Sequence, residues 1–308
     1  MLLEVLLRLV VVVTVMLIAA TAAFVGRYRL RDTRLEWRER VQEAAPITVV
    51  LVAVLLGNGV ARQTVPDLSW MIGWERTGQI EALEGSFIVW LQSQATPELT
   101  AYFSFVYIYA YVFLLVFPIV AYFALSNTRP LRELLAAYTL NYTLGLVCYV
   151  FVIAYGPRNM MPELVDALLY DTYPRYQHLT RQVNRNTNVF PSLHTSLATT
   201  VAFLAYRTRE IYPKWALVAL WVALSVAVST MYLGIHWAID VLAGVALAYV
   251  SVTLSGLLVG QWSVRNWLES RVPPQSEPSG HSGKRPRETR DPERDRAVEP
   301  TDSSGEEG

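Results

Sequence analysis

Long apolar runs recur along this chain and leave it few ways to fold. Seven of them stand out, at residues 5–25, 46–60, 100–125, 133–155, 191–206, 213–233 and 236–260. About 20 apolar residues in a helix span the hydrocarbon core of a bilayer, and helices satisfy the backbone polar groups that lipid cannot. With 53% hydrophobic residues and a mean hydropathy of +0.29, the chain is too apolar for an ordinary soluble domain. The sequence therefore predicts an all-α polytopic membrane protein with about seven transmembrane helices.

The polar segments divide the chain into three parts. Residues 1–45 contain the first run and an arginine-rich loop, and residues 46–262 contain the other six runs. Residues 263–308 are rich in Pro, Ser, Glu and Arg, a composition typical of a disordered tail. The segment Ala19–Ala23 resembles a signal-peptidase site. The first run is therefore either a retained helix, which its length favours, or a cleaved leader.

Residues 61–99 mix apolar and polar side chains. The apolar ones recur at helical spacing: Ile80, Leu83, Phe87, Ile88 and Leu91. Glu81, Glu84 and Gln92 are expected on other faces of this helix. The pattern predicts either an amphipathic helix in the membrane interface, where tryptophans serve as anchors, or a small cap outside the membrane.

The distribution of basic residues predicts the orientation. Nineteen Lys and Arg residues fall in segments on one side of the membrane and six in segments on the other. Because cytoplasmic segments carry the excess, we expect a cell-membrane protein whose N-terminus is outside and whose tail is cytoplasmic. The 156–190 loop then lies at the outer face. Equal totals of basic and acidic residues, 26 each, do not favour a nucleic-acid partner, and the sequence does not identify a protein partner.

His236 and Asp240 lie at the start of the last apolar run. Residues four apart share one face of a helix, so the carboxylate can accept the imidazole Nδ1–H and leave Nε2 as a nucleophile. An aspartate in a membrane segment is costly and is by default a functional candidate. A polar clamp between helices is the structural alternative.

Pro191, Ser192 and His194 open the fifth run. Free N–H groups in the first turn of a helix bind anions, and the Ser192 hydroxyl can add a donor. His194 is then placed to act as a general acid, unless it is only a packed core histidine. We expect the active site at the outer face, where the starts of both runs lie.

Basic residues on the outer side indicate an anionic substrate. Arg158 closes the fourth run, and its guanidinium can clamp phosphate oxygens or extend to the interface as a structural side chain. Arg181 and Arg185 lie in the loop that leads to Pro191. Alternatively, the arginines of this loop pair with its carboxylates. No His or Cys cluster has metal-ligand spacing, so we expect neither a metal nor another cofactor.

These motifs resemble the signatures of the type 2 phosphatidic acid phosphatase superfamily, in particular the branch related to inositol phosphorylceramide synthases. The second signature, Pro-Ser-Gly-His, is matched except that Leu193 replaces glycine. The third, Ser-Arg and then His and Asp at fixed spacing, is matched by Ser229, His236 and Asp240, with Thr230 in place of arginine. Of the first, only Arg158 is present. The resemblance covers roughly residues 46–260.

The resemblance implies a six-helix catalytic core that needs no metal. His236 is then the nucleophile that forms a phosphohistidine, Asp240 orients it, and His194 protonates the leaving group. The implied protein is a membrane lipid phosphatase or phosphotransferase that acts on a lipid phosphate or phosphodiester at the outer face. The alternative is a lipid transporter or scaffold that keeps the fold without the chemistry, which the changes at Leu193 and Thr230 leave open.

Overall fold

The computed structural model describes residues 2–174, 176 and 189–261, and this part of the chain is almost entirely helical. Its longer helices are α1 (Leu2–Ala20), α2 (Arg27–Ile72), α3 (Thr77–Ser93), α4 (Pro97–Phe105), α5 (Tyr111–Phe123), α6 (Arg129–Phe151), α10 (Leu193–Arg207), α11 (Pro213–Tyr232) and α12 (Ala238–Gln261). Two π-helical turns, η1 (Thr21–Val25) and η2 (Val106–Ala110), and two short helices, α7 (Pro157–Met160) and α8 (Leu168–Thr172), complete them. A two-residue parallel pair joins β1 (Trp74–Glu75) to β2 (Val152–Ile153). The predicted all-α class is confirmed, and the predicted tail lies outside the described residues.

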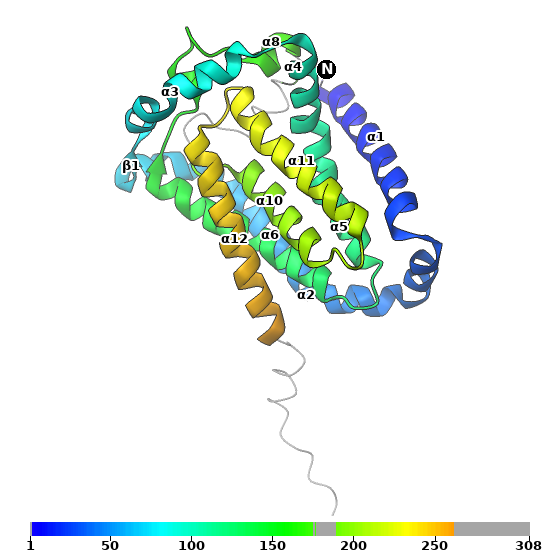
Figure 1. Ribbon diagram of the computed structural model, residues 1–308. Coiled ribbons are helices and arrows are strands. Elements are labelled where there is room, and N and C mark those ends of the chain that lie inside the picture. Colours follow the sequence, from blue (N-terminus) through cyan, green and yellow to red (C-terminus); the bar gives the residue numbers. More distant parts are fainter. Residues whose placement is uncertain (1, 175, 177–188, 262–308) are drawn as a thin grey trace, which may run out of the picture. The chain divides into compact units, whose positions relative to one another are not determined.

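Six of the seven predicted spans are long and apolar enough to cross a membrane. The remaining run, the fifth, forms α10, which has only 15 residues, or about 22 Å at 1.5 Å per residue. Helix α10 packs against α6, α11 and α12 (Figure 1), and most of its side chains are buried. It is therefore an interior helix of the bundle, covered by longer neighbours.

The arginine-rich segment predicted as a loop is helical instead, because α2 begins at Arg27 and continues to Ile72. Arg40 explains how this segment is fixed. Its buried guanidinium donates to the carbonyl of Phe123, at the end of α5, at 2.9 Å, and to Glu36 at 2.8 Å. The first half of α2 thus lies against the end of α5, and basic side chains that suggested a loop serve as helix contacts.

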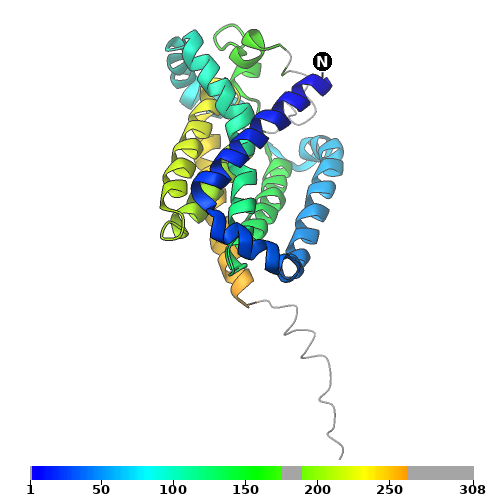
Figure 2. The same cartoon turned by 90° about the vertical axis from the view of Figure 1, so that its right-hand side faces the viewer.

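Large side chains of α5 and α11 form the centre of the bundle. The rings of Phe117 and Trp215 pack edge to face, 4.5 Å apart between centroids, and both are fully buried. Helix α1 crosses over α5 (Figure 2). One buried polar group deeper in the bundle is paired on both sides, since the Asn141 amide donates to Thr200 at 3.0 Å and accepts from Ser196. Pairing of this kind is what an apolar interior requires.

Helix α3 lies with α4 and α8 at one end of the bundle (Figure 1). Its orientation differs from the expectation. Ile80 and Ile88 face inward as predicted, but Glu84 and Gln92 share that inward face, whereas Leu83 is 77% exposed. The reason is that the inward face meets backbone groups of α12 and of the segments around it, which need polar partners.

Close contact between α12 and the start of α10 yields a prediction. A Cβ built on Gly244 would lie 2.6 Å from the carbonyl oxygen of Ser192. We expect Gly244→Ala to destabilise the protein by about 1–3 kcal/mol, because the two backbones must separate. Thermal unfolding in detergent measures the loss.

Gly256→Ala on the same helix is the matched control, since its Cβ would meet only the end of the Arg207 side chain, at 3.4 Å. Equal unfolding midpoints for the two variants would contradict the proposed helix contact.

Candidate active site

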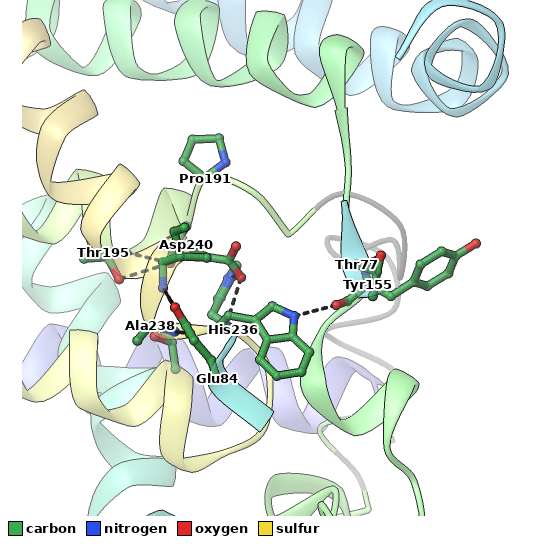
Figure 3. Close-up of polar contacts among 12 residues, drawn as sticks. Thr77, Glu84, Tyr155, Pro191, Thr195, His236, Ala238 and Asp240 are labelled. Carbon is green, nitrogen blue, oxygen red and sulfur yellow. Dashed lines mark hydrogen bonds and ion pairs between the residues drawn. The ribbon is translucent and has the colours of Figure 1, made fainter. Parts of the chain in front are cut away.

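The turn that precedes α12 brings His236 and Asp240 together. His236 Nδ1 lies 3.4 Å from Asp240 Oδ2, and the same oxygen accepts the backbone N–H of Trp237 at 2.9 Å (Figure 3). Both side chains are buried, and Asp240 Oδ1 has no hydrogen-bond partner among the described residues. The predicted contact is therefore present, with Nδ1 turned toward the carboxylate. The prediction that both residues share one helix face is wrong, because α12 begins at Ala238 and His236 lies in the turn before it.

Buried neighbours fix the backbone on either side of His236. The indole N–H of Trp237 donates to the carbonyl of Tyr155 at 2.8 Å, and the Trp237 side chain is fully buried. The carbonyl of Thr230 accepts the N–H groups of Ile235 and His236, each at 3.0 Å. The histidine thus lies on a turn that is held from both sides.

Ser192 caps α10. Its hydroxyl oxygen accepts the N–H of Thr195 at 3.3 Å and its hydroxyl donates to the Thr195 side chain at 3.0 Å, which is usual for serine at this position. The N–H of Ser192 donates to the carbonyl of Asp240 at 3.0 Å. One backbone hydrogen bond therefore joins the two histidine motifs. The hydroxyl that we expected to bind phosphate is engaged within the cap.

His194, in the first turn of α10, lies between two tyrosine rings. Tyr107 stacks on it at 4.7 Å between ring centroids and Tyr111 contacts it at 4.6 Å. Tyr107 belongs to the π-helical turn η2, and such turns often occur at functional sites. Sequence reasoning did not single out these two tyrosines, because aromatic residues are frequent throughout this run and only the contact with His194 distinguishes them.

Arg158 is connected to the turn before His236. Its backbone N–H donates to the carbonyl of Gly234 at 3.1 Å. Its guanidinium lies over the ring of Tyr170, 4.7 Å from the centroid. The buried Nη1 has no partner among the described residues. In that part of the chain Arg158 forms no ion pair with a carboxylate, so the predicted pairing with nearby acids is not seen for it.

The remaining expected ligands divide into two groups. Arg181 and Arg185 lie outside the described residues. The hydroxyls of Ser229 and Thr230 donate to carbonyls of their own helix, at 2.7 and 2.8 Å, so Thr230 does not replace the arginine of the third signature. Within the described ranges no group of three His, Cys, Asp or Glu could hold a metal.

Comparison with known families was made on the whole chain. A family model described as the PAP2 superfamily matches residues 78–254. Searches of curated proteins and of solved structures found no significant match. The matched region begins in α3 and ends in α12, so it contains Arg158, His194, His236 and Asp240 but not α1 or α2. Because this match covers more than half of the 308 residues and the histidine motifs meet within it, the chain belongs to the PAP2 superfamily.

Proposed function

We propose that the protein is a membrane phosphatase or phosphotransferase that acts on a lipid phosphate or phosphodiester through a phosphohistidine on His236. The observation that carries this proposal is the Asp240-paired His236, joined through the Ser192–Asp240 backbone bond to the motif that holds His194. Members of the superfamily are in general phosphatases or phosphotransferases. Within the superfamily, we propose that the protein belongs to the branch related to inositol phosphorylceramide synthases.

The chemistry proceeds in two transfers. His236 Nε2 attacks phosphorus while the bond from phosphorus to the ester oxygen breaks, and His194 donates a proton to the departing oxygen. Asp240 holds the Nδ1–H and stabilises the positive charge that forms on the ring. Water or an alcohol, deprotonated by His194, then attacks the phosphorus and releases His236.

Arg158 is the described residue best placed to bind the phosphate. Its backbone N–H is bonded to the turn before His236, its guanidinium lies over the ring of Tyr170, and its Nη1 has no partner among the described residues. A planar guanidinium can bind two phosphate oxygens at once. Arg181 and Arg185 remain proposed additional phosphate ligands. Whether water or an alcohol accepts the phosphoryl group decides between hydrolysis and transfer.

The first prediction concerns turnover. Purified protein in detergent is expected to release phosphate from one or more of phosphatidate, polyprenyl phosphate and polyprenyl diphosphate, or to consume lipid only when an alcohol is added. His236→Ala should abolish turnover and the phosphoenzyme. Asp240→Asn should lower kcat by about 10⁴-fold, as for other hydrogen-bonded His/Asp units.

Each outcome of this assay has a definite meaning. Release in water indicates a phosphatase, and alcohol-dependent consumption indicates a transferase. Turnover that survives His236→Ala rules out the phosphohistidine, and the absence of any His236-dependent turnover favours the transporter or scaffold.

A second prediction tests Arg158. Arg158→Lys keeps the charge but loses the planar, bidentate geometry, so KM is expected to rise by about tenfold, equivalent to about 1.4 kcal/mol of binding free energy. Arg129→Lys is the control, because Arg129 is exposed and pairs with Glu133 at the opposite end of the bundle. Steady-state kinetics measures both, and an unchanged KM in Arg158→Lys would exclude the proposed ligand.

A third prediction tests the outer location of the site. In a Cys148→Ala background, Leu164→Cys should react with an impermeant thiol reagent in intact cells, because Leu164 is exposed near Arg158. Arg209→Cys, in the exposed turn between α10 and α11, should react only after lysis. The reverse labelling pattern would invert the orientation.

A further inference from the structure

Glu84 is bonded to the start of the helix that carries Asp240. Its Oε2 accepts the N–H of Ala238 at 2.6 Å, and its two oxygens lie 2.9 and 3.2 Å from the N–H nitrogen of Ile239 (Figure 3). These are first-turn donors, which have no partner within their own helix. Glu84 comes from α3, 154 residues earlier in the chain than Ala238, so a distant helix provides the cap.

Two other side chains on the same face of α3 hold that helix in place. The Thr77 hydroxyl accepts the N–H of Tyr155 at 3.1 Å, and Tyr155 in turn accepts from the Trp237 indole. Gln92 donates to the carbonyl of Tyr232 at 3.0 Å. Glu84 is therefore fixed from both ends of α3 and presents its carboxylate to the turn beside His236.

We propose that Glu84 is a positioning residue for phosphoryl transfer, which holds the first turn of α12, and with it His236 and Asp240, against the start of α10. This inference rests on the proposed function. Glu84 touches no reacting atom in it, and it acts through the backbone N–H groups of Ala238 and Ile239.

A carboxylate suits this position for two reasons. Both carboxylate oxygens face the two N–H groups, whereas a glutamine would offer one acceptor oxygen and turn an NH₂ group toward the same donors. The negative charge also occupies a helix N-terminus that would otherwise attract the substrate phosphate. The phosphate is thereby left to Arg158 and to the start of α10.

The surroundings of Glu84 also shift its pKa. Burial raises the pKa of Glu84 above its ordinary value of 4.5, and the charge of Asp240 raises it further, while the bonds from Ala238 and Ile239 oppose the shift. The folded chain therefore holds the Glu84 proton more tightly than the unfolded chain does. This contribution to stability is present below pH 4.5 and is lost as pH rises through the raised pKa. The charged form of Glu84 is therefore disfavoured in the folded chain relative to the unfolded chain.

The experiment compares Glu84→Gln with Glu81→Gln at neutral pH. Glu81 lies on the same helix and accepts no hydrogen bond from α12 among the described residues, so its variant removes the same charge without removing the cap. We expect Glu84→Gln to lower kcat by about tenfold, with KM within about twofold and the unfolding midpoint within about 3 °C of the unmodified protein. Glu81→Gln should match the unmodified protein.

Reactivity of His236 provides a readout that does not need turnover. The rate of His236 carbethoxylation by diethyl pyrocarbonate, followed by mass spectrometry, should rise in Glu84→Gln and not in Glu81→Gln. If the unmodified protein shows no His236-dependent turnover, the proposed function fails, and this rate still decides whether Glu84 positions His236.

Two results would overturn the inference. One is an unchanged kcat and an unchanged His236 reactivity in Glu84→Gln. The other is a loss of kcat that parallels a large fall in the unfolding midpoint, which indicates a purely structural role. If Glu84→Gln does not fold, Glu84→Asp replaces it. That variant keeps the charge but is one methylene shorter, and an unchanged kcat in it overturns the inference equally.

Discussion

Backbone N–H groups at the start of α12 must find acceptors at the end of an apolar bundle, and the arrangement of the whole site follows from how they do so. Asp240 accepts the N–H of Trp237, and Glu84 accepts those of Ala238 and Ile239. Two carboxylates from distant parts of the chain thus converge on one helical turn. Asp240 also contacts the His236 ring, so the groups that begin the helix are the groups that orient the proposed nucleophile.

The start of α10 is hydrogen-bonded directly to this turn. Ser192 donates its N–H to the carbonyl of Asp240, and Gly244 lets the carbonyl of Ser192 approach α12 closely. Arg158 donates its N–H to Gly234 on the other side of the histidine turn. Backbone contacts, which vary little with side-chain motion, therefore connect the three segments that sequence reasoning assigned to the site.

Features with a local cause could be predicted from the sequence. Apolar runs predicted the helices, because the length of such a run is a local property. The spacing of His236 and Asp240 predicted their contact, although His236 lies in the turn before α12 and not on the helix itself. Features that depend on distant partners could not. The sequence did not show that Glu84 meets N–H donors of α12 on the inward face of α3. It also did not show that Arg40, in the segment predicted as a loop, contacts the end of α5. Only the fold shows which tyrosines reach His194.

Helix α3 turns Glu84 and Gln92 inward together with Ile80 and Ile88, and it turns Leu83 and Trp90 outward. Leu83 is 77% and Trp90 is 57% exposed, an area that lipid or detergent covers in a membrane protein. The outward and inward faces belong to one helix, whose diameter is about 10 Å. Solubilisation therefore acts within that distance of Glu84 and of the turn it caps. Kinetics of this protein should therefore be compared in detergent and in bilayer nanodiscs.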